Sequence, residues 1–217
     1  MDALEILYQD PFFIAVEKLS GLLTIPDGYD TSLPNLRSLL TSQFGRVWTV
    51  HRLDKDTSGI VIFALSADVH RALSVQFESR KVQKEYKAFI QGLLSTETMT
   101  IDIPLRVNGD RNHRTIADQV KGKPASTKVR LINEFTGYSL ITAHPKTGYT
   151  HQIRVHLSSI GHPILNDSLY GKTSALIPDT GTRLMLHASK LSFQHPILGS
   201  MVELCSSLPT EMANLIK

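Results

Sequence analysis

The residues best suited to chemistry lie in one short polar run, His51–Gly59, which reads HRLDKDTSG. Apolar residues precede this run and the apolar stretch Ile60–Leu65 follows it, so two buried strands are predicted to flank a charged loop. Inside the loop, Leu53 can anchor the chain to the core, and Asp54 lies between two basic neighbours. Nearby cations favour an ionised carboxylate. The spacing therefore predicts a fixed, ionised Asp54 that is suited to act as a nucleophile.

Two other interpretations of this loop are open from the residues alone. A polar β-turn built from ordinary turn residues would only connect two strands. Alternatively, Asp54 and Asp56 would form an acid/base pair for glycoside-type chemistry, which needs two carboxylates beside the bond. Arg52 and Lys55 favour the ionised form of both, however, and no apolar residue is placed to keep one protonated. The pattern therefore favours a single carboxylate nucleophile over the pair.

Other classes of catalytic site lack their sequence patterns here. His151 and His156 are five positions apart, about 140° round a helix, so they do not form an i, i+4 metal pair. The chain has no HExxH motif, no Cys/His zinc spacing, no GxSxG motif and no glycine-rich phosphate loop. The single cysteine, Cys205, has no predicted activating partner. We therefore expect neither a metal ion nor a cofactor.

The remaining pattern predicts an α+β scaffold around the loop. Thr150 is the expected N-cap of a helix that places Arg154 at the edge of its apolar face, and a strand turns Tyr86 inward beside Ala88. Helices are predicted at 34–45, ended by Gly45, at 67–80, capped by Ser66, at 150–161 and from Pro209. Strands are predicted at 4–8, 12–17, 60–65, 82–90, 126–132, 138–143, 184–187, 190–194 and 201–204, with a turn at 135–137 between the two that pair around it. Hairpin-like connections between the strands predict a largely antiparallel sheet.

The whole chain has the composition of a soluble globular protein, with 217 residues of which 41% are hydrophobic. No apolar run approaches the ~20 residues of a membrane span. The start, Met1–Glu5, lacks the basic region of a signal peptide, and a single cysteine excludes an internal disulfide. We expect a single domain over 1–217, located in the cytoplasm.

Basic residues are concentrated in the segment 106–130. It holds seven arginines and lysines against two aspartates, hence +5, in a chain whose net charge is +3. Such a segment indicates a polyanion-facing surface. A solvated hairpin with solubilising lysines is equally compatible. A fixed carboxylate, a basic hairpin and no cofactor motif favour a nucleic-acid-directed function without naming its reaction.

Five segments together resemble the RluA-type family of RNA pseudouridine synthases. They follow the family's order and are its aspartate, tyrosine, middle, arginine and late motifs: His51–Gly59, Lys84–Ala88, Gly122–Thr127, Thr147–Leu157 and Leu184–Ala188. The resemblance covers roughly residues 5–205. It implies a pseudouridine-synthase-like fold, with a central mixed, largely antiparallel sheet, flanking helices and loops, and a catalytic cleft.

The resemblance implies isomerisation of uridine to pseudouridine in structured RNA, with the target base flipped out of its helix. Asp54 would attack C1′ or act through a glycal, Tyr86 would stack on the base, and Arg154 would pair with the aspartate. Arg52 would fill the vacated position in the RNA stack. The resemblance also implies RNA contacts for His51, Thr57, Lys84, Thr150, His151 and Gln152.

The implied partner is a stem-loop of tRNA or rRNA, bound by a monomer without a membrane, metal or cofactor. The catalytic motifs begin too early for an N-terminal S4-type module, so we expect no separate RNA-binding domain. Three departures bear on RNA docking: Leu19 replaces a proline, Tyr149 an arginine, and Asn166–Ser168 a Gly-Asp-Pro-like turn. A non-catalytic RNA-binding or RNA-folding factor on the same scaffold is the alternative function. A third is a carboxylate-dependent nucleosidase that releases free base.

Overall fold

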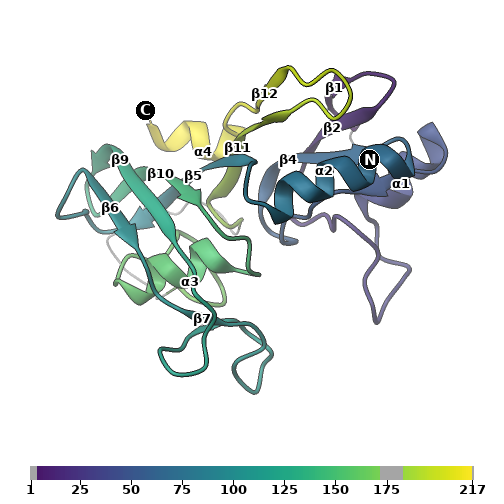
Figure 1. Cartoon of the computed structure of the whole chain (residues 1–217). Coiled ribbons are helices and arrows are strands. Elements are labelled where there is room, and N and C mark those ends of the chain that lie inside the picture. The colour runs from purple at the N-terminus through teal and green to yellow at the C-terminus, as the bar shows by residue number, and fades with distance from the viewer. Residues whose placement is uncertain (1–3, 172–182, 217) are drawn as a thin grey trace. The chain divides into compact units, whose positions relative to one another are not determined.

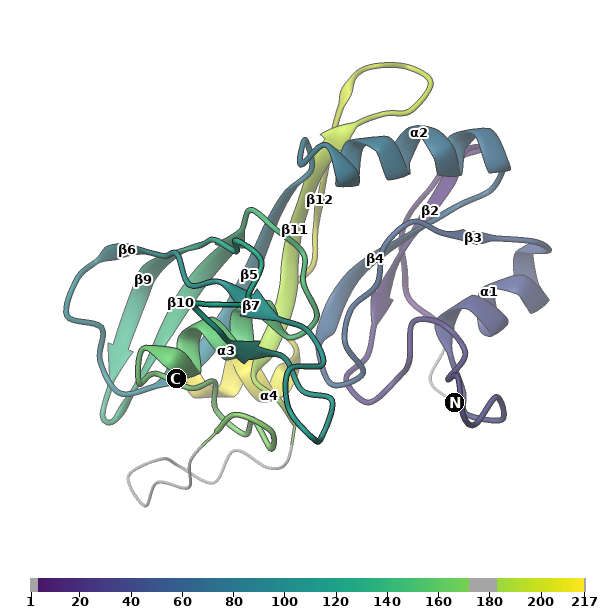
Figure 2. The ribbon, with the colours of Figure 1, turned by 60° about the horizontal axis from the view of Figure 1, so that its bottom comes forward.

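The computed structural model describes residues 4–171 and 183–216, and their contacts group into two compact units. Unit 1 combines Met1–Lys84 with Ala188–Ser207, and unit 2 combines Glu85–His187 with Leu208–Lys217. Figure 1 and Figure 2 show the elements of each unit. No helix among the described residues is long and apolar enough to cross a membrane. The expectation of a single catalytic domain over 1–217 stays a prediction.

Unit 1 is a small antiparallel sheet with two helices. Three strands pair antiparallel in the order β1 (Ile6–Gln9), β2 (Phe13–Lys18) and β4 (Ser58–Ala64). Short β3 (Trp48–Thr49) also pairs with β4. In the same unit, β12 (Met201–Cys205) pairs antiparallel with β11 (Leu186–Gln194). The helices are α1 (Leu36–Phe44) and α2 (Ala67–Glu78).

The core of unit 1 explains why the loop before β4 is held firmly. Every residue of β4 is buried, as expected for a continuous apolar strand. One face of β4 packs with β2 and with Val69 and Leu73 of α2 (Figure 2). The predicted cap of α2 is confirmed, because the Val69 amide donates to Ser66 Oγ at 3.3 Å. Gly59, at φ 118°, leaves no room for a side chain, since a Cβ would lie 2.3 Å from the Ala188 carbonyl oxygen.

Unit 2 is built on four antiparallel strands, in the order β5 (Gln83–Gln91), β10 (Tyr138–Pro145), β9 (Thr127–Phe135) and β6 (Thr98–Ile101). A separate pair joins β7 (Leu105–Arg106) to β8 (Ile116–Ala117). The helices are α3 (Gln152–Ser159) and α4 (Thr210–Ala213), followed by the 3₁₀ turn η1 (Asn214–Ile216). The fully buried Phe89, Ile141 and Leu157 join the sheet and α3 in one core.

The predicted fold class is confirmed, because helices flank a largely antiparallel sheet. Two local predictions are wrong. Positions 184–187 and 190–194 are not separate strands, because β11 runs unbroken through Ser189, whose side chain is buried. Thr150 does not cap α3 either. The cap position is His151, at φ 56°, and it makes no side-chain capping bond.

Candidate active site

The loop that carries Asp54 is held through its backbone carbonyl groups. The carbonyl of Leu53 accepts a hydrogen bond from the Thr24 hydroxyl at 3.0 Å, and the amide of Leu53 donates to the Thr24 hydroxyl oxygen at 3.2 Å. The carbonyl of Asp54 accepts the Thr57 amide at 3.2 Å, which closes a turn. Leu53 itself is buried, as predicted, so the half-buried Asp54 directly follows an anchored residue.

A buried lysine fixes the next part of this loop. Lys18, at the end of β2, is fully buried, and its ammonium donates to the carbonyls of Leu19 at 3.0 Å, Leu22 at 2.6 Å and Lys55 at 2.7 Å. The Gly21 amide donates to the same Lys55 carbonyl at 2.9 Å. A buried charge must be compensated by hydrogen bonds. Lys18 therefore ties the turn that follows β2 to the loop that carries Asp54.

Ser20 completes this set of hydrogen bonds, because its hydroxyl donates to the Asp56 carbonyl at 2.6 Å. We call the bonds from Thr24, Lys18, Gly21 and Ser20, with the turn closed by Thr57, the clamp. All four carbonyls from Leu53 to Asp56 thus accept hydrogen bonds. Local support of this kind keeps a reactive side chain in one geometry. The sequence predicted 18–21 only as a turn, and the exchange of a family proline for the exposed Leu19 leaves the clamp intact.

Replacing the lysine of the clamp with an apolar residue of similar length, Lys18→Met, is expected to destabilise the protein by about 3 kcal/mol, because three backbone carbonyls lose their charged donor. Denaturant unfolding of the variant against wild type measures this loss. Ser20→Ala serves as the milder control and removes a single neutral hydrogen bond. Equal stability of wild type and Lys18→Met would show that the clamp does not support the loop.

His51 lies three positions before Asp54 and is held as a neutral ring. Its Nε2 accepts the Ile62 amide at 3.1 Å, and its ring stacks on Phe77 with centroids 4.7 Å apart. Burial, with a further contribution from the Lys84 charge, lowers the pKa of His51 to about 3. Because Nε2 accepts a bond, the proton lies on Nδ1. The His51 ring is therefore an uncharged donor near neutral pH.

The other predicted RNA contacts of unit 1 differ in exposure. Arg52 is exposed, as a side chain that enters RNA must be. Thr57 is buried, and its hydroxyl has no hydrogen-bond partner among the residues that the structure describes. Lys84 is half-buried, and burial, followed by the charge of Arg80, lowers its pKa. These positions are compatible with RNA contacts, and their roles stay predictions.

In unit 2, Arg154 lies deeper than expected. We predicted it at the edge of the apolar face of α3, but its side chain is only 2% exposed and Asp167 is fully buried. The guanidinium Nε donates to Asp167 Oδ2 and Nη2 to Oδ1, each at 2.7 Å. A bidentate pair of this kind fixes both side chains. Arg154 is therefore held rigidly, although its burial is not what the apolar periodicity indicated.

Asp167 is a site residue that the sequence reasoning missed. It lies in Asn166–Ser168, which was noted only as a departure from the family's turn. Besides Arg154, its Oδ1 accepts the amides of Leu169 and Tyr170, each at 3.0 Å. The aspartate retained in the middle of that turn was the available signal, because an arginine buried on a helix requires a carboxylate.

Gln152 organises the start of α3 from inside the protein. Its Oε1 accepts the Thr147 hydroxyl at 2.7 Å and the Tyr149 amide at 3.2 Å. Its Nε2 donates to the Ser126 carbonyl and to the Thr127 hydroxyl, each at 3.0 Å. These bonds use the two donors and two acceptor positions of the amide. The geometry thus gives Gln152 a positioning role, and its predicted RNA contact stays a prediction.

The other two predicted contacts next to α3 are more accessible. Thr150 is exposed, and His151 is half-buried with its Nδ1 3.0 Å from the Tyr170 hydroxyl. Burial raises the pKa of Tyr170 to about 12, and its ring lies 5.3 Å from the guanidinium carbon of Arg154. His151 and Arg154 therefore share Tyr170 as a neighbour. This small cluster joins two motif residues within unit 2.

Tyr86 lies on β5 and pairs in register with Ala143 of β10. Its ring is half-buried and packs against the core of unit 2, as its predicted inward orientation requires. Asp54 belongs to unit 1, whereas Tyr86 and Arg154 belong to unit 2. The pairing of Arg154 with Asp54 therefore stays a prediction.

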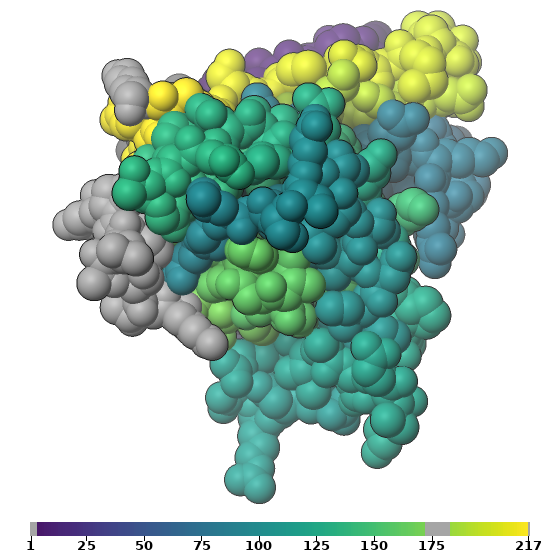
Figure 3. All heavy atoms as spheres, turned by 90° about the vertical axis from the view of Figure 1, so that its left-hand side faces the viewer, coloured from purple at the N-terminus to yellow at the C-terminus, as the bar shows by residue number. Residues whose placement is uncertain are grey.

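Most of the basic segment 106–130 forms loops around β7 and β8, whereas its residues 127–130 lie on β9. Figure 3 shows teal atoms of these loops as projections at the bottom of the view. Two of its arginines are neutralised locally, since Arg106 pairs with Asp118 at 2.8 Å and Arg114 with Asp110 at 2.7 Å. The other five basic residues of the segment are exposed: Arg111, Lys121, Lys123, Lys128 and Arg130. Only the short pair of β7 and β8 forms a hairpin, since Lys128 and Arg130 lie on β9, so the extended hairpin is confirmed in part. The contact of these charges with a polyanion stays a prediction.

No group of three or more histidine, cysteine, aspartate or glutamate side chains is arranged to hold a metal ion within 4–171 and 183–216. The candidate chemistry described so far rests on a clamped carboxylate in unit 1 and on a buried arginine and a half-buried tyrosine in unit 2.

Known proteins match this chain over most of its length. The profile of the RNA pseudouridylate synthase family matches residues 12–159. The tRNA pseudouridine synthase C of Pasteurella multocida is 39% identical, over 98% of this chain and 95% of that protein. The dual-specificity RNA pseudouridine synthase RluA of Haemophilus influenzae is 36% identical, over 90% of this chain and 89% of that protein. The solved human RNA pseudouridylate synthase domain containing 1 aligns with a TM-score of 0.80 and 29% identity, over 96% of this chain and 84% of that one. The chain therefore belongs to the RNA pseudouridine synthase family.

Proposed function

We propose that this protein isomerises uridine to pseudouridine in a stem-loop of tRNA or rRNA, with Asp54 as its nucleophile. The observation that carries the proposal is the clamp on the loop, in which every carbonyl from Leu53 to Asp56 accepts a hydrogen bond. A backbone held this firmly presents its carboxylate without further ordering at the moment of reaction. Membership of the family supplies the reaction class.

In the proposed reaction, the N1–C1′ bond of the target uridine breaks and the C5–C1′ bond forms. The C5 proton is lost and N1 regains a proton, so the product is an isomer of the substrate. Asp54 attacks C1′ or acts through a glycal. Arg154 orients that carboxylate, and its fixed guanidinium is consistent with such a role. The target base must first leave its stack, at a cost of a few kcal/mol.

Binding of RNA is proposed to rest on phosphate contacts, with Arg52 filling the vacated stack and the basic segment 106–130 as a further surface. The other proposed contacts are His51, Thr57, Lys84, Thr150 and His151. Affinity that depends on phosphate contacts falls as salt rises. We propose that the protein acts in the cytoplasm as a monomer. The relatives named for tRNA and for dual specificity favour tRNA, rRNA or both as substrates.

The proposal is tested on RNA from a strain that lacks this protein. Purified protein is added back, and pseudouridine is mapped chemically at single-nucleotide resolution. We expect one or more uridines in tRNA or rRNA to be restored. Release of free uracil would identify a nucleosidase, and unchanged RNA would favour the non-catalytic RNA-binding factor.

We propose that the Tyr86 hydroxyl assists removal of the C5 proton. Tyr86→Phe is therefore expected to retain RNA binding and to lose catalysis, because the ring can still stack on the base but has lost that hydroxyl. Binding is measured on the substrate RNA and catalysis by single-turnover pseudouridine formation. If the variant loses binding and stability together, Tyr86 is a structural residue of the unit 2 core.

A further inference from the structure

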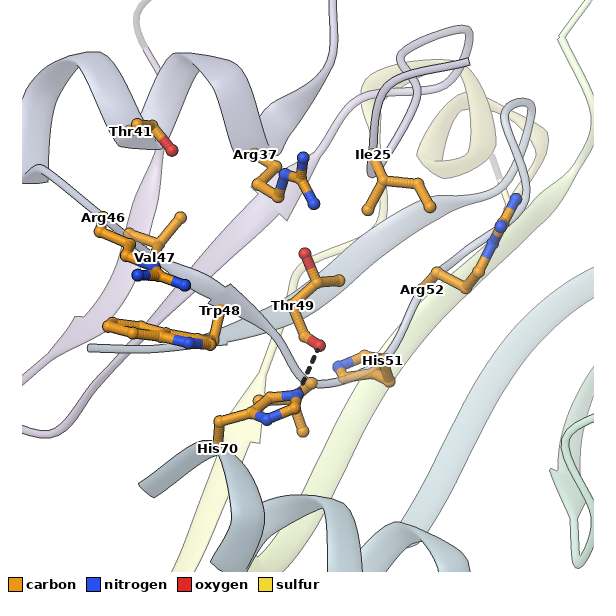
Figure 4. Close-up of a pocket in the computed structure, with 11 residues that line it drawn as sticks. Ile25, Arg37, Thr41, Arg46, Val47, Trp48, Thr49, His51, Arg52 and His70 are labelled. Carbon is orange, nitrogen blue, oxygen red and sulfur yellow. Dashed lines mark hydrogen bonds between the residues drawn. The ribbon is translucent and has the colours of Figure 1, made fainter. Parts of the chain in front are cut away.

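A pocket of about 680 Å³ opens in unit 1 beside the catalytic loop (Figure 4). Its lining comes from four places in the chain: Ile25, α1, the segment 46–52 that leads to Asp54, and His70 of α2. The segment 106–130, which the sequence singled out for RNA, belongs to unit 2. The pocket is therefore a separate candidate for ligand binding.

The lining of this pocket carries positive charge and contains no acidic side chain. Arg37 from α1 and Arg46 and Arg52 from the segment before the catalytic loop are all exposed. No carboxylate among the described residues forms an ion pair with any of the three. Cations gathered around a concave, solvent-filled surface raise the local concentration of anions. A phosphate group is the anion that guanidinium groups recognise best in a nucleic acid.

Arg46 is held at the pocket wall by an aromatic ring. Its guanidinium carbon lies 4.9 Å from the centroid of the Trp48 ring, and Figure 4 shows the two side chains against each other. Trp48 is half-buried and packs against the core of unit 1. A guanidinium stacked on a fixed ring loses less freedom when it binds a phosphate. Arg46 is thus partly preorganised for an anion.

The wall of the pocket is fixed by an internal hydrogen bond between α2 and β3. The Nε2–H of His70 donates to the Thr49 carbonyl at 3.2 Å, which ties α2 to β3. The hydroxyl of Thr49 is buried and has no hydrogen-bond partner among the described residues. In Figure 4 the labelled side chains of Arg37 and Thr49 lie on the same side of the pocket. The exposed guanidinium groups of Arg37 and Arg46, and not this buried hydroxyl, are therefore the groups that a phosphate can reach.

We propose that this pocket binds a phosphate of the RNA backbone next to the target uridine, with Arg37 and Arg46 as its cationic ligands. The inference rests on the proposed function and extends the RNA footprint beyond Arg52. The occupant is a backbone phosphate because the lining runs directly through Arg52 into the loop that carries Asp54. RNA threaded past that loop therefore carries a neighbouring phosphate to these two arginines.

The test compares the double variant Arg37→Gln/Arg46→Gln with a control that removes two cations of unit 1 outside the pocket. Arg71→Gln/Lys190→Gln is suitable, because those charges already pair with Asp68 at 3.2 Å and Glu203 at 2.8 Å. The dissociation constant for substrate RNA is measured across a range of salt concentrations, and the single-turnover rate is measured at saturating RNA.

We expect the pocket variant to bind RNA several-fold more weakly, with a salt slope reduced by about 0.7 for the loss of one phosphate contact to a single strand. Its rate at saturating RNA stays near wild type, and the control keeps the wild-type slope.

An unchanged slope in the pocket variant overturns the inference. A second result also overturns the inference. In it, wild type binds inorganic phosphate or uridine 5′-monophosphate, the variant does not, and both bind RNA equally well, which means that the pocket binds a free anion. The salt slope is measured from RNA binding alone and does not depend on catalysis. If the wild-type protein binds RNA without modifying it, the proposed function is refuted, while the slope still tests whether the pocket binds a phosphate.

Discussion

Asp54→Asn is expected to abolish pseudouridine formation while the protein stays folded. The substitution keeps the shape of the side chain but removes the nucleophile, so the rate should fall by at least about 10⁴-fold. The fold should survive because the loop is held by its carbonyl groups and by the Lys18 clamp, which the substitution does not touch. Single-turnover kinetics and thermal unfolding measure the two effects.

The matched control for this variant is Asp56→Asn, which removes a carboxylate from the same loop. The structure records the backbone carbonyl of Asp56 as the acceptor for Ser20 at 2.6 Å. We therefore expect Asp56→Asn to keep most of the activity. Loss of activity in both variants would revive the interpretation of two cooperating carboxylates. Persistent activity in Asp54→Asn would remove Asp54 from the mechanism.

Arg154→Met is expected to cost about 3–5 kcal/mol of stability, because it leaves the buried carboxylate of Asp167 without its partner. The side chains are 2% and 0% exposed, so water does not replace the lost interaction. Denaturant unfolding measures the loss. Activity should also fall, but the single variant does not separate a misaimed nucleophile from a damaged fold.

The double variant Arg154→Met/Asp167→Asn separates the two causes. It removes both buried charges, and the asparagine oxygen still accepts the amides of Leu169 and Tyr170, so much of the stability should return. If Arg154 orients Asp54, catalysis should stay at least about 10²-fold below wild type. A stable double variant with wild-type single-turnover rates would confine Arg154 to a structural role.

Local sequence patterns were sufficient to predict the elements that carry the site. The apolar run after Gly59 predicted β4, and the caps Ser66 and Gly45 correctly marked the start of α2 and the end of α1. The hairpin at Phe135–Tyr138 was visible in its turn residues. These features depend on neighbours a few residues apart, which a single sequence displays directly.

The support of the site was not predictable in the same way. Lys18 contacts the Lys55 carbonyl across 37 positions, and Gln152 reaches the Ser126 carbonyl across 26. Both are polar residues with buried side chains, whereas pattern reasoning places polar residues at the surface. The burial of Arg154 depends on Asp167, which lies outside its helix. Contacts of this kind become visible only once the chain is folded.

The central claim is that the protein changes the atom through which uracil is attached to its ribose from N1 to C5. This claim is tested most directly with substrate RNA carrying tritium at C5 of uridine. Formation of the C5–C1′ bond expels that hydrogen to water. We predict tritium release equal to the pseudouridine formed, with no free uracil and no release by Asp54→Asn. Labelled free uracil from the wild-type protein, or tritium release undiminished in Asp54→Asn, would contradict the account.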